Sequence, residues 1–132
     1  MTNHASGSFE VKLIPIKDEG DDAGLGKMSI DKQYHGDLEA TGKGIMLSSA
    51  ATVVKGSGGY VAMERVTGTL KGRSGSFVLQ HSGTMTRGTP QLSVTVVPDS
   101  GTGQLEGLTG TMNIKIDEGK HSYEFEYSLP QR

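Results

Sequence analysis

The amino-acid sequence predicts an all-β fold, specifically a closed eight-stranded antiparallel barrel with meander topology, on three observations. Apolar and polar residues alternate along several segments, as in strands that bury one face. The 20 glycines are spread between these segments, where they mark turns and bulges. No segment keeps the 3.6-residue apolar period of a helix. A meander with one apolar side can bury it by closing into a barrel, and a sandwich of two sheets is the alternative.

Length and composition indicate one domain of 132 residues. We expect residues 8–132 to form the barrel, after a flexible N-terminus at residues 1–7. The absence of cysteine excludes disulfides and thiolate metal sites, and no cofactor is expected. The formal charge of −2 and the scattered basic residues argue against a nucleic-acid partner. No apolar run approaches the roughly 18 residues that cross a bilayer, and the polar N-terminus is unlike a signal peptide, so we expect a cytoplasmic protein without a membrane partner.

The first half of the chain contains three predicted strands. Residues 8–16 form the first, and an acidic, glycine-containing loop at residues 17–26 leads to the second, at residues 27–39. The residues expected to share the buried face of these two strands are Phe9, Val11, Leu13, Met28, Ile30, Tyr34 and Leu38. Residues 44–54 are apolar but alternate poorly, so either face of this third strand could be the buried one.

Three β-hairpins are predicted in the second half of the chain, after a turn at residues 56–59. The predicted turns are Arg73–Ser74, Gly88–Thr89 and Glu118–Gly119. Counting back from these turns pairs Leu70 with Phe77, Met85 with Leu92, and Ile116 with His121. In each hairpin, the register set by the turn also gathers apolar residues on one face, so turn chemistry and hydrophobic pattern agree.

Glu64 and His81 form the clearest candidate site, because both fall on the apolar face of the first hairpin. The predicted register places Val66 opposite His81 and Glu64 opposite Gly83. Glu64 and His81 are then diagonal neighbours about 7–8 Å apart at Cα, within reach of each other's side chains. A buried carboxylate and imidazole could act as general base and acid. The alternative is a buried pair that satisfies its own hydrogen bonds and fixes the register.

Aromatic residues are candidates for the lining of a ligand cavity, in which a phenol hydroxyl would orient a polar group. The candidates are Tyr34, Tyr60, Phe77, Tyr123 and Phe125. Packing in the core is the alternative role for these side chains. None of the four histidines belongs to a recognisable metal-site motif, so no metal site is predicted.

One stretch of the chain resembles two known families. Residues 101–110, with the sequence GTGQLEGLTG, resemble the G-x-G-x-[FL]-x-G-x-x-G stretch of allene oxide cyclases and plant dirigent proteins. That resemblance implies an allene-oxide-cyclase-like, eight-stranded antiparallel barrel that shelters a reactive apolar small molecule. Nearly the whole chain is also similar to a family of small bacterial proteins of unknown function with the same type of barrel, most clearly at residues 35–40, 59–68, 77–83 and 97–103.

Three functional hypotheses follow. The first, which we favour, is a module that binds a small apolar or amphipathic molecule inside the barrel. The second is an isomerase or cyclase that uses Glu64 and His81. The third is a filled barrel that acts through its surface as a homo-oligomer. A cavity would distinguish the first two from the third.

Overall fold

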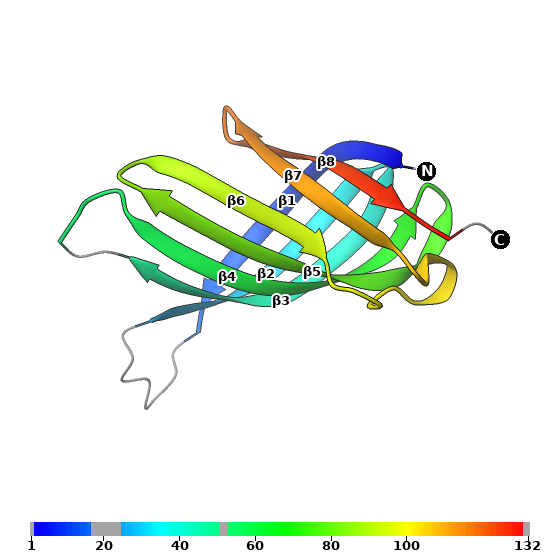
Figure 1. The fold of residues 1–132 in the computed structure, drawn as a ribbon, viewed down its shortest axis with the longest axis horizontal. Helices are drawn as coiled ribbons and strands as arrows, with labels where there is room; N and C mark the ends of the chain where they lie inside the picture. Colours follow the sequence, from blue (N-terminus) through cyan, green and yellow to red (C-terminus); the bar gives the residue numbers. More distant parts are fainter. Residues whose placement is uncertain (1, 17–24, 51–52, 131–132) are drawn as a thin grey trace.

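The computed structural model describes residues 2–16, 25–50 and 53–130. Its eight strands form a closed barrel in which each strand pairs with the next and β8 pairs with β1, as Figure 1 shows. The elements are β1 Asn3–Pro15, β2 Gly26–Gly36, β3 Leu38–Ala50, β4 Gly58–Leu70, β5 Arg73–Thr86, β6 Thr89–Val96, the 3₁₀ helix η1 Gly103–Leu105, β7 Thr109–Asp117 and β8 Lys120–Ser128. The predicted antiparallel meander barrel is therefore confirmed.

Strand β1 begins earlier than predicted. Residues 3–7, which we expected to precede the barrel, are part of the strand and pair with β8 from Asn3 opposite Tyr127 onward. Ala5, in this first part of β1, is completely buried. The strand therefore closes the barrel from its first residues.

The turns between β4 and β5, between β5 and β6 and between β7 and β8 each have a glycine as their second central residue. Both central residues have positive φ in each turn: 47° and 83° at Lys71–Gly72, 48° and 89° at Arg87–Gly88, and 50° and 79° at Glu118–Gly119. This is the type I′ arrangement that suits the twist of a hairpin. The predicted third turn is confirmed, whereas the predicted turns at Arg73–Ser74 and Gly88–Thr89 are wrong.

The two wrong turns change the predicted strand registers but not which side chains point into the barrel. Glu64 lies opposite Leu79 rather than Gly83, and His81 lies opposite Ala62 rather than Val66. In the next hairpin Met85 lies opposite Pro90. Both shifts are by an even number of residues, and side chains alternate with a period of two, so the same residues still point inward.

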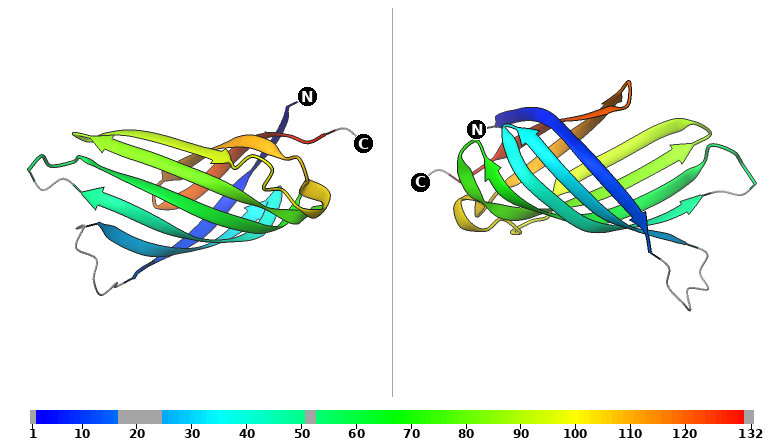
Figure 2. Two further views of the ribbon diagram at one scale, coloured as in Figure 1. Left: turned by 60° about the horizontal axis from the view of Figure 1, so that its bottom comes forward. Right: turned by 180° about the vertical axis from the view of Figure 1, so that it is seen from behind.

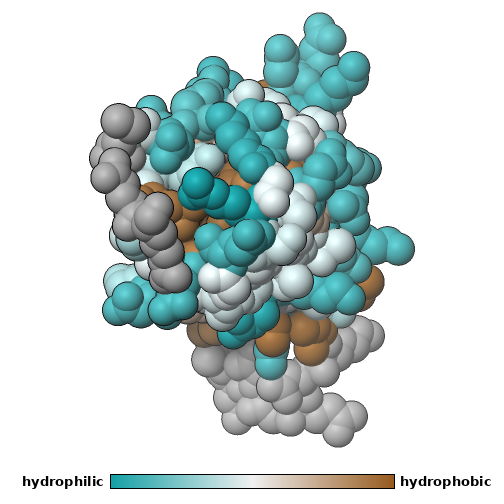
Figure 3. Space-filling view, turned by 90° about the vertical axis from the view of Figure 1, so that its right-hand side faces the viewer, coloured by the Kyte–Doolittle hydropathy of each residue, from teal (hydrophilic) through white to brown (hydrophobic). Residues whose placement is uncertain are grey.

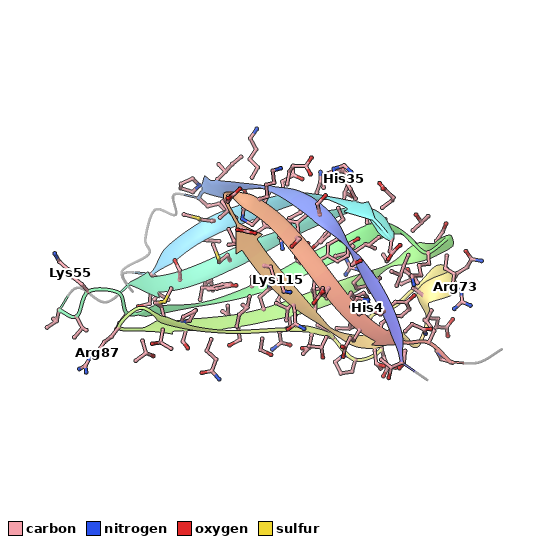
Figure 4. The ribbon with its side chains drawn as sticks, turned by 90° about the horizontal axis from the view of Figure 1, so that it is seen from above. His4, His35, Lys55, Arg73, Arg87 and Lys115 are labelled. Carbon is pink, nitrogen blue, oxygen red and sulfur yellow. The ribbon has the colours of Figure 1, made fainter. Side chains whose placement is uncertain are left out.

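The two ends of the barrel differ. Strands β6 and β7 share only one paired position, Thr95 with Thr111, and they diverge toward one end (Figures 1 and 2). We call this the open end; it carries the β3–β4, β5–β6 and β7–β8 connections. Lys55 and Arg87 project from two of these tips, whereas Arg73 lies at the opposite, closed end (Figure 4).

The core fills the closed half of the barrel. The connection at residues 97–108 runs along the end of β5, where Val97 donates to the Val78 carbonyl and Thr102 donates to the Ser76 carbonyl. It places Leu105 and Leu108 in the core, each 1% exposed. Buried aliphatic and aromatic side chains from all eight strands complete this cluster. Seen from this end, the surface is mostly hydrophilic (Figure 3).

Strand β3 has apolar side chains on both faces, which explains its poor alternation in the sequence. Met46 points inward opposite the buried Ala62, whereas its neighbours Ile45 and Leu47 lie on the outer face and are exposed. On that outer face they pair with Met63 and Val61 of β4. Of the residues predicted at 44–54, those at 51 and 52 lie outside the described residues. No helix in the described part of the chain is long and apolar enough to cross a membrane.

Candidate functional site

Glu64 and His81 meet inside the barrel. Nε2 of His81 lies 2.9 Å from Oε1 of Glu64, and the two residues are 3% and 0% exposed respectively. They remain diagonal neighbours on β4 and β5, because His81 follows the partner of Glu64, Leu79, by two residues. The predicted placement of this pair is confirmed, and a catalytic role for it stays a prediction.

Lys32 and Tyr34 of β2 complete the cluster around Glu64. Nζ of Lys32 donates to Glu64 Oε1 at 3.1 Å, and the Tyr34 hydroxyl donates to Oε2 at 2.5 Å. Gly42 of β3 leaves the space that the carboxylate occupies, since a Cβ there would lie 2.0 Å from Oε2. We call Lys32, Tyr34, Glu64 and His81 the polar cluster. Every enclosed polar atom of the described side chains has a hydrogen-bond partner.

Lys32 is the residue of this cluster that the sequence prediction missed. It lies in phase with Ile30 and Tyr34, two residues expected to face the core. That phase was the available signal, but lysine is rarely buried unless it is paired. In the structure it is 7% exposed, and its ammonium lies 4.9 Å from the centre of the Phe9 ring.

The cluster stabilises Glu64 as a carboxylate. Burial alone would raise the pKa of Glu64, but the hydrogen bond from His81, the charge of Lys32 and the hydrogen bond from Tyr34 together lower it below its usual value. Burial and then the negative charge of Glu64 raise the pKa of Tyr34 well above its usual value. At neutral pH Glu64 is therefore ionised and Tyr34 is protonated. A carboxylate with three donors and a lowered pKa is a weak base.

His81 uses one of its two ring nitrogens within the polar cluster. Its hydrogen bond within the described residues is made by Nε2, and Nδ1 has no partner there. Since no enclosed polar atom of the described side chains is unpartnered, Nδ1 is not fully enclosed. Gly83 is the next inward-facing residue of β5 toward the open end, and the Tyr60 ring occupies the space at this glycine.

An apolar recess of about 370 Å³ lies inside the open end, between β3, β4, β5 and β6. The side chains that line it include Met46, Ser48, Tyr60, Met85 and Leu92. Met85 and Leu92 point inward yet are 41% and 43% exposed, because no side chain of the described residues fills the space in front of them. The recess begins one layer from His81, at Gly83 and Tyr60.

Tyr60 is the candidate ligand-binding aromatic residue that the structure places in the recess. Its ring packs on Gly83, where a Cβ would lie 2.5 Å from a ring carbon. Burial raises the pKa of its hydroxyl, so the phenol is protonated at neutral pH. That hydroxyl has no hydrogen-bond partner among the described residues and is free to meet a ligand.

The other four aromatic candidates lie in the closed half. Tyr34, Phe77, Tyr123 and Phe125 are at most 1% exposed. Phe77 stacks on Phe125 with ring centres 5.8 Å apart, and the Tyr123 hydroxyl accepts from the Leu38 amide at 2.9 Å. These residues pack the core, and among them Tyr34 also belongs to the polar cluster. Among the described residues, no three His, Cys, Asp or Glu side chains are placed to hold a metal ion.

Comparisons with known proteins agree with this fold. A sequence profile of a family described as "Protein of unknown function (DUF3224)" matches residues 5–127. A solved structure of a protein of unknown function from the same family, from Shewanella oneidensis MR-1, is 49% identical, with a TM-score of 0.91 and coverage of 100% of both chains. No curated protein matches the chain. The chain therefore belongs to the DUF3224 family.

Proposed function

We propose that the protein binds a small apolar or amphipathic molecule in the recess at the open end of the barrel. The observation that carries this proposal is the contrast between the two halves of the interior. The closed half is packed with its own side chains, whereas the open half leaves about 370 Å³ between apolar walls. That volume falls within the range of roughly 300–1,000 Å³ that is typical of small-molecule sites.

The lining of the recess suits an amphipathic ligand. Met46 and Met85 lie on its walls, and methionine side chains adapt to ligands of different shape. The Tyr60 hydroxyl supplies a polar atom at the wall of the recess. A ligand with an apolar body against the methionines and a polar group near the Tyr60 hydroxyl would satisfy both parts of the site.

Filling the recess should weaken binding. Ser48 lines the recess, and Ser49 is the next residue of β3, on the outer face. We expect Ser48→Trp to weaken binding of the neutral fluorescent probe N-phenyl-1-naphthylamine more than tenfold, because the indole would occupy the site. Ser49→Trp is the matched control and should leave the affinity unchanged. Equal affinity in both variants, with unchanged circular dichroism, would rule out the recess as the site.

A second candidate function is proton transfer by an isomerase or cyclase, with His81 as the base. The observation that favours it is an imidazole whose Nε2 is held by a carboxylate while Nδ1 has no partner among the described residues. Nδ1 would take a proton from a ligand carbon next to a carbonyl, which leaves an enolate, and would return a proton in the next step. The third hypothesis, an oligomer that acts through its surface, stays a prediction.

Hydrogen exchange in a ketone tests the second candidate. In D₂O the protein should accelerate replacement by deuterium of the hydrogens at C2 of 1-tetralone, which proton NMR follows directly. His81→Gln should remove the acceleration, because the side-chain amide is not a base. If the wild-type protein binds 1-tetralone but does not accelerate exchange, proton transfer is not its function.

A further inference from the structure

The aromatic side chains of the barrel contact one another, with one exception. The chain has four tyrosines and three phenylalanines. In the structure six of these rings lie in pairs or short series, with centres between 5.3 and 5.8 Å apart. The six are Phe9, Tyr34, Phe77, Tyr123, Phe125 and Tyr127. The ring of Tyr60 has no contact with another aromatic ring of the described residues, and it lines the recess.

The Tyr60 ring lies against the wall of the barrel. A Cβ on Gly83 would lie 2.5, 3.1 and 3.2 Å from three carbons of this ring, so the ring covers the glycine and occupies the place of a side chain there. On the other neighbouring strand Tyr60 lies opposite Ser48, which is also small. Neither neighbour therefore covers the part of the ring that borders the recess.

The walls of the recess carry no charge. None of the side chains that line it is acidic or basic, and burial raises the pKa of the Tyr60 hydroxyl, which is protonated at neutral pH. Deeper in the barrel, Lys32 and Glu64 pair with each other at 3.1 Å. The buried Ala62 separates Glu64 from Tyr60 along the inward face of β4. A charged group in the recess would lose hydration without meeting a counterion on the walls.

We infer that the recess selects an uncharged compound with a flat aromatic ring, which stacks on the ring of Tyr60 and turns its edges toward Met46 and Met85. This inference rests on the proposed function and names its ligand class. Aromatic rings attract one another beyond the burial of their area, and methionine sulfur makes favourable contacts with ring edges. A saturated hydrocarbon gains neither contact.

Naphthalene and its saturated counterpart, decalin, test the preference for a flat ring. Each competes with N-phenyl-1-naphthylamine in wild-type protein, Tyr60→Leu and Tyr60→Phe, and the affinity ratio of naphthalene to decalin is compared between proteins, which cancels the difference in hydrophobicity. The ratio should fall roughly two- to tenfold in Tyr60→Leu, as loss of one aromatic pair implies. Tyr60→Phe should keep the wild-type ratio, because it loses the hydroxyl and retains the ring.

Leu92→Ala is the matched control for the ring. Leu92 lines the recess and is 43% exposed, so its truncation removes apolar wall without removing an aromatic contact. Naphthalene and decalin should both bind more weakly to this variant, with an unchanged ratio. Circular dichroism should show that all three variants keep the fold.

A second pair of probes tests the preference for an uncharged ligand. The compound 8-anilinonaphthalene-1-sulfonate is N-phenyl-1-naphthylamine with one added sulfonate. Wild-type protein should bind the sulfonate more weakly by a factor of about ten or more. Ser48→Lys places an ammonium at the wall of the recess and should reduce that difference, whereas Ser49→Lys, on the outer face of β3, should leave it unchanged.

The outcomes separate this inference from the proposed function. If none of the uncharged probes binds, the proposed function fails and the inference fails with it. If Ser48→Trp weakens binding of N-phenyl-1-naphthylamine but the ratio of naphthalene to decalin is the same in Tyr60→Leu as in wild type, binding in the recess stands and stacking on Tyr60 is wrong. Equal or tighter binding of the sulfonate by wild-type protein would overturn the selection of an uncharged ligand.

Discussion

Replacing Glu64 with glutamine is expected to destabilise the fold by about 3–5 kcal/mol, which is the usual cost of removing one partner of a buried ion pair. The substitution leaves the Lys32 ammonium, 7% exposed, without its counterion. It also weakens the acceptor of the hydrogen bonds from Tyr34 and His81. Urea unfolding followed by circular dichroism measures the change.

The control for this variant is Glu126→Gln, on the exposed face of β8, which should change stability by less than about 0.5 kcal/mol. A loss below about 1 kcal/mol in Glu64→Gln would contradict the account. It would mean that the Lys32 ammonium is solvated and that the polar cluster is not a sealed charge pair.

Adding Lys32→Met to Glu64→Gln is expected to restore most of the lost stability. The double variant contains neither charge, and a buried ion pair can often be replaced by uncharged residues of similar volume at little cost. Methionine keeps much of the apolar stem of Lys32 against Phe9. The coupling energy between the two sites should therefore reach several kcal/mol in a double-mutant cycle.

The combination Lys32→Met with Glu126→Gln provides the comparison for this rescue. It removes the same cation but leaves Glu64 charged, so this double variant should be no more stable than Lys32→Met alone. If the effects of the substitutions at Lys32 and Glu64 on the free energy of unfolding simply add, the two residues do not stabilise the fold as an ion pair. The buried charges would then have separate solvent contacts or separate partners.

The hairpins show why the sequence predicted the faces of the strands better than their partners. Between β4 and β5 the chain reads Lys71-Gly72-Arg73-Ser74-Gly75, so two glycines compete to define the turn. A type I′ turn needs positive φ at both central residues, which favours glycine as the second of them. That preference selects Lys71–Gly72. Because the resulting shift is even, Glu64 and His81 still meet.

Only part of the polar cluster could be predicted from the sequence. The phase of Ile30 and Tyr34 also puts Lys32 inside, and a buried lysine requires a carboxylate, so Glu64 could have been named as its partner. The position of Gly42 against the carboxylate depends on the pairing of β3 with β4, in a strand whose buried face the sequence left undecided.

The recess could not be predicted from strand patterns. Leu92 and Met85 carry the same alternation signal as the buried Val94 and Leu79 on their strands, yet their exposed fractions differ greatly. The difference comes from the divergence of β6 from β7, which share one paired position. That divergence is a property of the closed ring as a whole, and no single strand records it.

Methionine methyl NMR tests most directly whether the recess is the binding site. Four of the described methionines lie in three settings: Met46 and Met85 line the recess, Met63 is on the outer face, and Met112 is 2% exposed in the core. On titration with N-phenyl-1-naphthylamine, the account predicts that the methyl resonances of Met46 and Met85 shift while those of Met63 and Met112 stay in place. A shift of Met63 with Met46 and Met85 unchanged would place the ligand on the outer surface of β3 and β4, and would contradict a binding site inside the barrel.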